Sequence, residues 1–413
     1  MKNILFVSIA FPPKSDAEGL QVAKYLKYMA RLGEGSFTID AVTSALPTLN
    51  MPTDHSLEPM LRGVRQIVEL PIYENRYSNF LIRKVLPWAA TSPDPKSTFH
   101  LQARRVIRQL QNKPDLIYSR SFPMSSAIMA YKLKRIYGVP WVMHLSDIWA
   151  DCPERNYQGF SRSIQERLER MCFEAADMIC VTSEKTRAFY ERKYSHLKHR
   201  IEHYPNVFDL DNAETVCDFG VLHNDNSNRK FRIVHTGSLV GGRSAAPLLE
   251  ALSRLDPCVQ EQLEVLLVGP LDHANSKIID HWKLSFVKIY GQVEYQESLR
   301  IQRSADLLVL IDMPVANPDL RVYFPSKLLD YMLAGPPILA IGDEGSEIQH
   351  VLREHSLGQY VERNDTETLI RSINSAILFE SGENKRPLKG VPEIYSAEYN
   401  AARLLKLFQN MLQ

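Results

Sequence analysis

Short apolar runs alternate with helix-period segments along the whole chain. The runs of the first half predict strands at Ile4–Ile9, Phe37–Thr43, Gln66–Leu70, Leu116–Ser119, Trp141–His144 and Met178–Thr182. Those of the second half predict strands at Phe231–Thr236, Glu264–Gly269, Phe286–Ile289, Leu307–Ile311 and Ile338–Ile341. Helical patterns of the first half lie at Leu20–Leu32, Thr98–Gln111, Met124–Tyr137, Ser163–Ala176 and Glu184–Tyr194. This alternation predicts an α/β protein with parallel sheets covered on both faces.

The length of the chain and the restart of this pattern predict two domains. A chain of 413 residues is too long for one ordinary hydrophobic core and suits two. We place the linker at Tyr204–Asp209, so that the first domain covers residues 1–205 and the second covers residues 206–395. The remaining segment has the pattern of an amphipathic helix at Ala397–Leu412.

The net charge, the cysteines and the lengths of the apolar runs indicate what class of protein this is. A net charge of +1 argues against bulk nucleic-acid binding, which needs a markedly basic domain. Five cysteines without a C-x-x-C pair favour reduced thiols. The chain runs from Met1 almost directly into its first predicted strand, and no apolar run approaches the ~20 residues that span a bilayer. These features predict a cytoplasmic protein.

One segment of the second half combines a helix start with groups that suit a nucleotide. Pro325 fits a first helical turn, where its missing N–H is not needed. The free N–H groups of that turn, which runs through Leu328, can bind a phosphate together with Ser326 and Lys327. One turn further, Asp330 can hold two vicinal hydroxyls, as on a ribose. The segment therefore suits a nucleoside diphosphate. The alternative is an ordinary helix start with a solvated acid.

The same segment, Pro-Ser-Lys-x-x-Asp-Tyr-x-x-Ala-Gly-x-Pro, resembles the donor-site signature of the family 4 glycosyltransferases. These are retaining sugar transferases with the GT-B fold. This chain has Asp330 in place of the family's second acid, Glu. Val322 stands at the position of the first acid, and Pro325 replaces a glycine. The resemblance implies two doubly wound, Rossmann-like domains that face a central cleft. It also implies that residues 396–413 cross back to the first domain. The alternative is a helix that closes its own domain.

The resemblance assigns roles to residues of the first domain. The loop after the first strand is similar to a family loop that approaches the donor phosphates, with Gly19 kept and Glu18 in place of a second glycine. His144, at a strand end, corresponds to a histidine that contacts the donor sugar. The alternative is a hydrogen-bonded core histidine. Asp147 could bind the acceptor hydroxyl or orient His144, or it could cap a short turn.

In the second domain, the strand end Gly237–Ser244 resembles a family segment with two cations on the donor diphosphate. Ser238 follows Gly237 where the family has the first cation, and Arg243 takes the place of the second. An arginine can hold phosphate oxygens in a bidentate fork. Lys327 could supply the missing charge. The alternative for Arg243 is a solvated loop residue.

Two further turns resemble parts of the family donor site. Gly269 follows a strand, in a turn near the donor. Gln292 and Val293 resemble a segment whose backbone reads the edge of the nucleobase. Either turn could equally be a plain strand end.

These features imply a glycosyltransferase that moves a sugar from a nucleoside diphosphate sugar to an acceptor hydroxyl with retention, without a metal or other cofactor. Arg243, Lys327 and the helix start would stabilise the leaving diphosphate. A nucleotide-sugar 2-epimerase of the same fold remains an alternative. So does a non-catalytic protein that binds a sugar or a partner, because a fold does not fix activity.

Two basic segments of the first domain suggest where an acceptor binds. Arg76–Trp88 mixes cations with aromatic and aliphatic residues, and Arg104–Arg108 adds a basic run on a predicted helix. Such segments suit the anionic face of a membrane, where lipid-linked acceptors reside. We therefore hypothesise a peripheral enzyme of surface-polysaccharide or lipid-linked glycan assembly on the cytoplasmic leaflet. The alternative is a helix with a buried apolar side and solvated charges.

Overall fold

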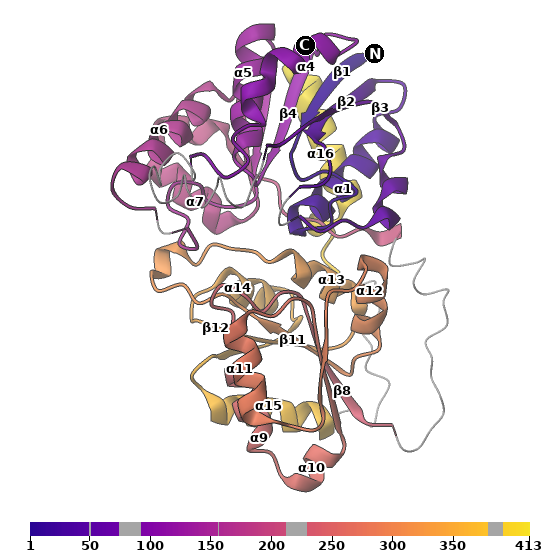
Figure 1. The fold of residues 1–413 in the computed structure, drawn as a ribbon, viewed down its shortest axis with the longest axis vertical. Coiled ribbons are helices and arrows are strands. Elements are labelled where there is room, and N and C mark those ends of the chain that lie inside the picture. Colours follow the sequence, from indigo (N-terminus) through magenta and orange to yellow (C-terminus); the bar gives the residue numbers. More distant parts are fainter. Residues whose placement is uncertain (49–50, 74–91, 156, 212–228, 379–390) are drawn as a thin grey trace. The chain divides into compact units, whose positions relative to one another are not determined.

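The computed structural model describes residues 1–48, 51–73, 92–155, 157–211, 229–378 and 391–413. These residues form two compact units. The first unit comprises residues 1–207 and 394–413, and the second comprises residues 208–393 (Figure 1). Each unit is a parallel α/β domain with its own hydrophobic core.

In its described residues, the first unit has a sheet of seven strands in the order β3-β2-β1-β4-β5-β6-β7, and all neighbouring pairs are parallel. The strands are β1 (Lys2–Val7), β2 (Phe37–Ser44), β3 (Val64–Leu70), β4 (Leu116–Ser121), β5 (Trp141–Leu145), β6 (Met178–Val181) and β7 (Ile201–His203). The order reverses between β1 and β4. This reversal is the switch point of a doubly wound sheet, beside which ligands commonly bind.

Helices cover both faces of this sheet because right-handed connections run in opposite directions from the switch point. The helices are α1 (Ala17–Leu32), α4 (Ala103–Gln109), α5 (Ser125–Tyr137), α6 (Gly159–Ala175), α7 (Glu184–Lys193) and α16 (Ala397–Met411). Short 3-10 turns lie at His55–Leu61, His100–Gln102, Ser195–Arg200 and Glu393–Tyr395. Helix α1 begins where the Asp16 side chain accepts a hydrogen bond from Gly19 N, which is an ordinary N-cap.

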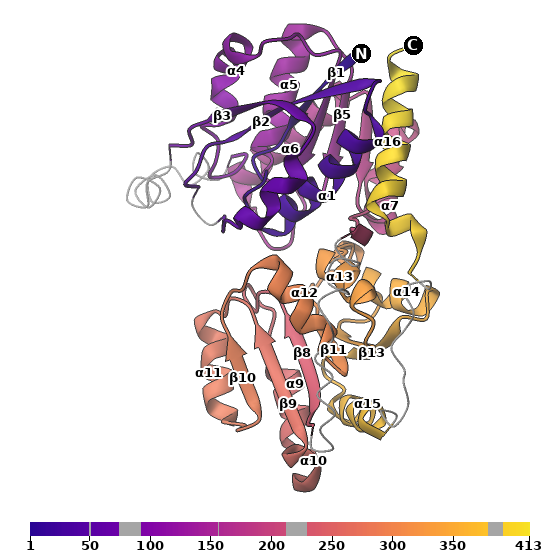
Figure 2. The same ribbon diagram turned by 90° about the vertical axis from the view of Figure 1, so that its right-hand side faces the viewer.

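The last helix, α16, packs along α1 in the core of the first unit (Figure 2). Its buried face carries Ala401, Leu404 and Phe408, spaced three and four residues apart as on one helical face. The Phe408 ring lies 5.6 Å from the Tyr118 ring of β4. The two ends of the chain therefore share one hydrophobic core.

The second unit repeats the doubly wound pattern. Its sheet has the order β10-β9-β8-β11-β12-β13, again with parallel neighbours. The strands are β8 (Phe231–Thr236), β9 (Leu263–Val268), β10 (Val287–Tyr290), β11 (Leu307–Ile311), β12 (Ile338–Gly342) and β13 (Gly358–Glu362). The helices are α9 (Ala246–Ser253), α10 (Pro257–Glu261), α11 (His273–Trp282), α12 (Tyr295–Arg303), α13 (Ser326–Ala334), α14 (Glu347–Glu354) and α15 (Thr366–Leu378), with a 3-10 turn at Pro318–Leu320.

The fold class predicted from the sequence is confirmed, with local corrections. The predicted helix Thr98–Gln111 is a 3-10 turn followed by the shorter α4. Helix α1 starts three residues before the predicted Leu20, at the Asp16 cap. Strands β7 and β13 were not predicted, since β7 is only three residues long and much of β13 is exposed.

Candidate functional site

Helix α13 begins at the carboxyl end of β8, and a tyrosine holds it there. The buried Tyr331 hydroxyl accepts a hydrogen bond from Thr236 N at 2.8 Å and lies 3.2 Å from the carbonyl oxygen of Val309. Tyr331 thus links α13 to the end of β8 and to the middle of β11. Pro325, expected inside the first turn, is instead the N-cap residue, with an extended ψ of 126°. The helix ends at Gly335, whose φ of 101° suits glycine.

Lys327 is a buried cation at the start of this helix. Its Nζ atom is inaccessible to solvent and has no hydrogen-bond partner among the described residues. The Lys327 side chain lies over Gly237, where an added Cβ would stand 2.3 Å from Nζ. Burial, and then the charge of Arg243, lower the pKa of Lys327 to about 7. A buried ammonium without a partner is costly, so this position suits an anion.

Two glycines bring backbone close together beside Lys327. Gly237 has a φ of 115° and Gly269 a φ of 131°, a region that L side chains rarely adopt. A Cβ on Gly269 would lie 2.5 Å from the carbonyl oxygen of Gly237. The ends of β8 and β9 therefore pack backbone on backbone. Ser238 follows Gly237 and is half-buried.

The loop that carries Arg243 is fixed by a side chain that the sequence did not reveal. The buried Asn275 side chain donates to the carbonyl oxygens of Leu239 at 2.9 Å and Arg243 at 2.8 Å, and it accepts from Ala245 N at 2.9 Å. The Arg243 side chain is half-exposed, and its charge reaches Lys327. The structure brings these two predicted cations together. The only local signal for Asn275 was its place three residues after Asp272, the N-cap of α11.

A second unpredicted residue, Asp312, directly follows β11. Burial raises its pKa to about 6, and the charges of Arg243 and Arg363 oppose that rise. Its position after the predicted strand Leu307–Ile311 was a usable signal, because ligands bind beyond the carboxyl ends of parallel strands.

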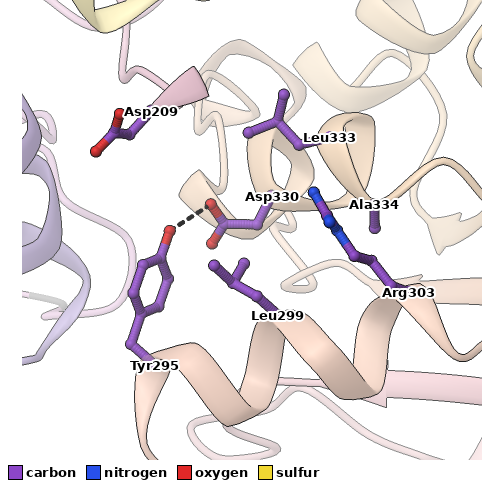
Figure 3. A pocket seen from close by; sticks show the side chains of 7 residues that line it. All are labelled: Asp209, Tyr295, Leu299, Arg303, Asp330, Leu333 and Ala334. Atoms are coloured by element: carbon purple, nitrogen blue, oxygen red, sulfur yellow. Dashed lines mark hydrogen bonds between the residues drawn. The ribbon is translucent and has the colours of Figure 1, made fainter. Parts of the chain in front are cut away.

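Asp330 lines a small hollow between α12 and α13 (Figure 3). The hollow holds about 250 Å³, part of it open to solvent, and is lined by Asp209, Tyr295, Leu299, Arg303, Asp330, Leu333 and Ala334. The Asp330 carboxylate is 7 % exposed and accepts a hydrogen bond from the Tyr295 hydroxyl at 3.0 Å. The predicted alternative of a solvated acid is therefore wrong.

The other predicted donor-binding residues of the second unit differ in their burial. Ser326 is half-buried in the first turn of α13. Leu328 is fully buried, and its amide donates to the carbonyl oxygen of Pro325 at 3.0 Å, so it offers neither side chain nor N–H to a ligand. Gln292 and Val293 follow the edge strand β10, with Gln292 exposed and Val293 half-buried.

In the first unit, Glu18 belongs to a buried ion pair that was not predicted. Arg120, at the end of β4, is fully buried and donates from Nε to Glu18 Oε1 at 2.8 Å. The Ser146 hydroxyl donates to the other Glu18 oxygen. Burial raises the pKa of Glu18 to about 7, while Arg120 opposes the rise. Arg120 comes directly after the predicted strand Leu116–Ser119, and that position was its only signal.

Gly19 serves the packing of its own loop. A Cβ at this position would lie 2.2 Å from the carbonyl oxygen of Lys14. Gly19 is buried, and its amide donates to Asp16 Oδ1 at 3.2 Å. The loop, rather than a ligand, therefore fills the space that the missing side chain leaves.

His144 is a core residue in this structure. It is fully buried, with Nε2 3.0 Å from the carbonyl oxygen of Tyr204 and Nδ1 2.7 Å from the Tyr118 hydroxyl. A carbonyl only accepts, so Nε2 carries the proton and Nδ1 accepts from Tyr118. Burial lowers the pKa of His144 well below its usual value. The geometry favours the core alternative over contact with a sugar. Asp147 is half-buried and close enough to raise the pKa of Glu18.

Comparisons with known proteins agree with this architecture. The glycosyl transferase 4-like domain family matches residues 22–206. The protein has a glycosyl transferase 4-like domain. A comparison with curated protein sequences found no significant match.

Solved GT-B structures extend the likeness to the whole chain. A sucrose-phosphate synthase from Thermosynechococcus elongatus has a TM-score of 0.68 at 16 % identity, over 100 % of this chain and 99 % of its own. Anabaena HepE, crystallised with UDP and glucose, has a TM-score of 0.65 at 15 % identity, over 99 % of this chain and 100 % of its own. WaaG, a glycosyltransferase involved in lipopolysaccharide biosynthesis, has a TM-score of 0.61 at 14 % identity, over 97 % and 99 %. The GT-B fold predicted from the sequence is confirmed, and the predicted family agrees with the domain match over residues 22–206.

The basic helix of this glycosyl transferase 4-like domain is α4. Arg104, Arg105 and Arg108 are exposed on it, next to the exposed Leu101, while Val106 is buried. The other predicted basic segment, Arg76–Trp88, lies outside the described residues. In the described part of the chain, no helix has the length and apolar character needed to cross a membrane.

Proposed function

We propose that this glycosyltransferase takes its sugar from a nucleoside diphosphate sugar and transfers it with retention to an acceptor hydroxyl. The observation that carries the proposal is the buried Lys327 ammonium, which has no partner in the described structure and lies against Gly237 beside Arg243. A diphosphate is the anion that fits two adjacent cations and a helix start. The Anabaena HepE structure with UDP and glucose supports this donor class through its shared fold.

The chemistry follows from where negative charge develops. When the bond between the sugar and the diphosphate breaks, the charge grows on the phosphate oxygens. Lys327, Arg243 and the free N–H groups at the start of α13 are already held in place to stabilise that charge. The acceptor would attack from the face that the diphosphate leaves, and a phosphate oxygen would take the acceptor proton. Asp147 of the first unit is the residue we propose for the acceptor hydroxyl.

Asp330 is proposed to hold the ribose of the donor. Asp330→Ala should lower kcat/KM for the donor by ~10- to 100-fold, because one or two charge-assisted hydrogen bonds are lost. Tyr295→Phe is the matched control, since it removes the hydroxyl bound to Asp330 at 3.0 Å and keeps the carboxylate. Equal kinetic losses in both variants would mean that Asp330 acts only through its bond to Tyr295.

The acceptor is proposed to be a growing surface polysaccharide or a lipid-linked glycan. The exposed arginines of α4 suit an anionic lipid surface. Co-sedimentation with anionic vesicles at low and high salt tests this, with Arg104, Arg105 and Arg108 replaced together by glutamine as the comparison. Absence of binding at low salt would indicate a soluble acceptor.

The reaction itself is tested with a panel of nucleotide sugars. Products from UDP- and GDP-linked hexoses, incubated with lipid-linked and free glycan acceptors, are identified by mass spectrometry and their anomeric configuration by NMR. Transfer with retention supports the proposal. An epimerised nucleotide sugar would instead indicate the 2-epimerase, and binding without any product would indicate a non-catalytic protein.

A further inference from the structure

A second hollow of the second unit lies at the carboxyl ends of β11 and β12. It holds about 230 Å³, part of it open to solvent, and is lined by Asp312, Met313, Val315, Arg321, Tyr323 and Asp343. The family signature has an acid at the position of Val322, but that side chain is apolar and 4 % exposed here. Its neighbour Tyr323 lines the hollow, together with Asp312 and Asp343, the carboxylates that follow β11 and β12.

The two carboxylates of the hollow differ in how many partners they have. Asp343 forms an ion pair with Arg363 and accepts a hydrogen bond from Val315 N at 3.1 Å. Its oxygens therefore hold the loop after β11. Asp312 accepts one hydrogen bond, from Met313 N to Oδ1 at 2.7 Å. No hydrogen bond or ion pair reaches Asp312 Oδ2 from a described residue.

The hollow adjoins the proposed diphosphate site. A Cβ on Gly242, in the loop of Arg243, would lie 3.4 Å from Pro314 Cγ, so this loop packs against the segment that follows Asp312. The charge of Asp312 also acts on Lys327, although the two groups form no ion pair. If Lys327 and Arg243 bind the diphosphate, the sugar attached to it would lie near the Asp312 carboxylate.

Hydrogen bonds within the protein hold the rim of the hollow. Arg321 donates to the carbonyl oxygen of Val315 at 2.9 Å and to that of Glu344 at 2.5 Å, which ties the loop after β11 to the loop after β12. The absence of a side chain at Gly342 leaves room for the Tyr360 hydroxyl and for Asp312, which would lie 2.3 Å and 3.0 Å (Cβ) from a Cβ there. The carboxylate is therefore held in position, and one of its oxygens remains available.

We propose that Asp312 accepts hydrogen bonds from hydroxyl groups of the donor sugar and that this hollow is the sugar subsite. The inference rests on the proposed nucleotide-sugar donor. A carboxylate oxygen without a donor of its own is suited to vicinal sugar hydroxyls, which supply one or two O–H donors. Asp312 would then determine which sugar is accepted, while Lys327 and Arg243 hold the diphosphate that every donor shares.

Calorimetry with a nucleoside diphosphate and its hexose conjugate separates this role from that of a counter-ion. UDP with UDP-glucose and GDP with GDP-mannose serve as probe pairs. Asp312→Ala should weaken binding of the conjugate by ~10- to 100-fold. It should leave affinity for the free diphosphate unchanged or raise it, because a negative charge near the cations is removed. Asp312→Asn keeps the shape of the side chain and should weaken binding of the conjugate less than Asp312→Ala does.

Controls make each outcome decisive. Asp319→Asn removes an exposed carboxylate from the same loop and should change neither affinity. Thermal unfolding of each variant checks that the fold is kept. If Asp312→Ala changes the affinities for the conjugate and for the free diphosphate equally, Asp312 acts only as a counter-ion. If neither affinity changes, the inference is also overturned. If the wild type binds neither partner of any pair, the proposed function fails together with this subsite.

Discussion

Each unit holds a buried cation at the carboxyl end of a parallel sheet, but only one of these cations is neutralised by the protein. Arg120 of the first unit bonds to Glu18 at 2.8 Å and to the Asn206 side chain at 2.7 Å, and it lies over the Tyr25 ring. Lys327 of the second unit has no hydrogen-bond partner among the described residues, and the positive charge of Arg243 lowers its pKa.

This difference supports different roles for the two charges. A buried charge that is fully paired fixes the conformation around it, and breaking the pair is costly. A buried charge without a partner destabilises the free protein and is relieved when an anion binds. We therefore assign Arg120 a structural role in the first unit, and the proposed function gives Lys327 of the second unit a ligand to bind.

The neighbours of Arg120 show what it holds. Asn206 belongs to the segment by which the chain leaves the first unit. Gln21 binds the same segment through both the N and O of Val207, at 2.7 and 3.1 Å. The Tyr25 hydroxyl donates to the carbonyl oxygen of Pro205 at 2.6 Å. Residues 204–207 are therefore fixed to the first unit by buried side chains.

The largest expected effect comes from removing the paired cation. Arg120→Met should lower the free energy of unfolding by about 3–5 kcal/mol, because it leaves the Glu18 carboxylate buried without its partner. Chemical denaturation measures it. Arg187→Met, which breaks an exposed pair with Glu184 at 2.7 Å, is the control and should cost less than about 1 kcal/mol. A double variant with Glu18→Gln should recover part of the loss. A cost for Arg120→Met no larger than that of the control would contradict the structural role.

The unpaired cation should behave in the opposite way. Lys327→Met should weaken binding of a nucleoside diphosphate by about 1.5–3 kcal/mol, the size of a charge-assisted hydrogen bond. The same change should leave the free energy of unfolding unchanged or raise it, since a buried, unpaired charge is replaced by an apolar side chain of similar length. Calorimetry and denaturation measure the two effects, and Lys277→Met, on an exposed face of α11, is the control. If Lys327→Met were less stable but bound the nucleoside diphosphate normally, Lys327 would have the structural role and not the binding role.

Much of the fold was predictable from the sequence because its signals are local. The buried strands are continuous apolar runs, and α13 is bounded by Pro325 and Gly335 within eleven residues. The resemblance to the family also assigned Gly237 and Lys327 to one donor site. What these signals could not supply was the burial of Lys327 Nζ, which depends on packing against β8.

The missed residues are those defined by tertiary contacts alone. Arg120 and Asp312 each follow a predicted strand. The partners of Arg120, Glu18 and Asn206, lie far away in the sequence, and no described residue donates a hydrogen bond to Asp312 Oδ2. For His144 the strand end was predicted correctly, while its burial depends on the Tyr204 carbonyl, sixty residues further along the chain. A sequence pattern indicates that such a residue is near a sheet edge. It does not indicate whether the protein or a ligand completes its environment.

The smallest effect that we predict is a dependence of donor affinity on pH, which Lys327 should cause and Arg120 should not. Burial and Arg243 lower the pKa of Lys327 to about 7 in the unliganded protein, and a bound diphosphate would raise it. Below pH 7 the lysine is already protonated, so affinity should be independent of this group. As the pH rises above 7, binding requires uptake of a proton, and affinity should fall by up to about tenfold per pH unit until the pKa of the complex is reached.

The measurement uses a nucleotide sugar such as UDP-glucose, whose phosphates do not titrate in this range. Calorimetry at pH 6 to 9, in two buffers with different ionisation enthalpies, gives the affinity and the number of protons taken up. Lys327→Met should bind more weakly at every pH and lose the dependence above pH 7. Arg120 remains charged throughout, so Arg120→Met should keep the slope of the wild type even if it is less stable. Identical slopes in the wild type and Lys327→Met would show that Lys327 does not meet the donor, and the distinction between the two cations would then fail.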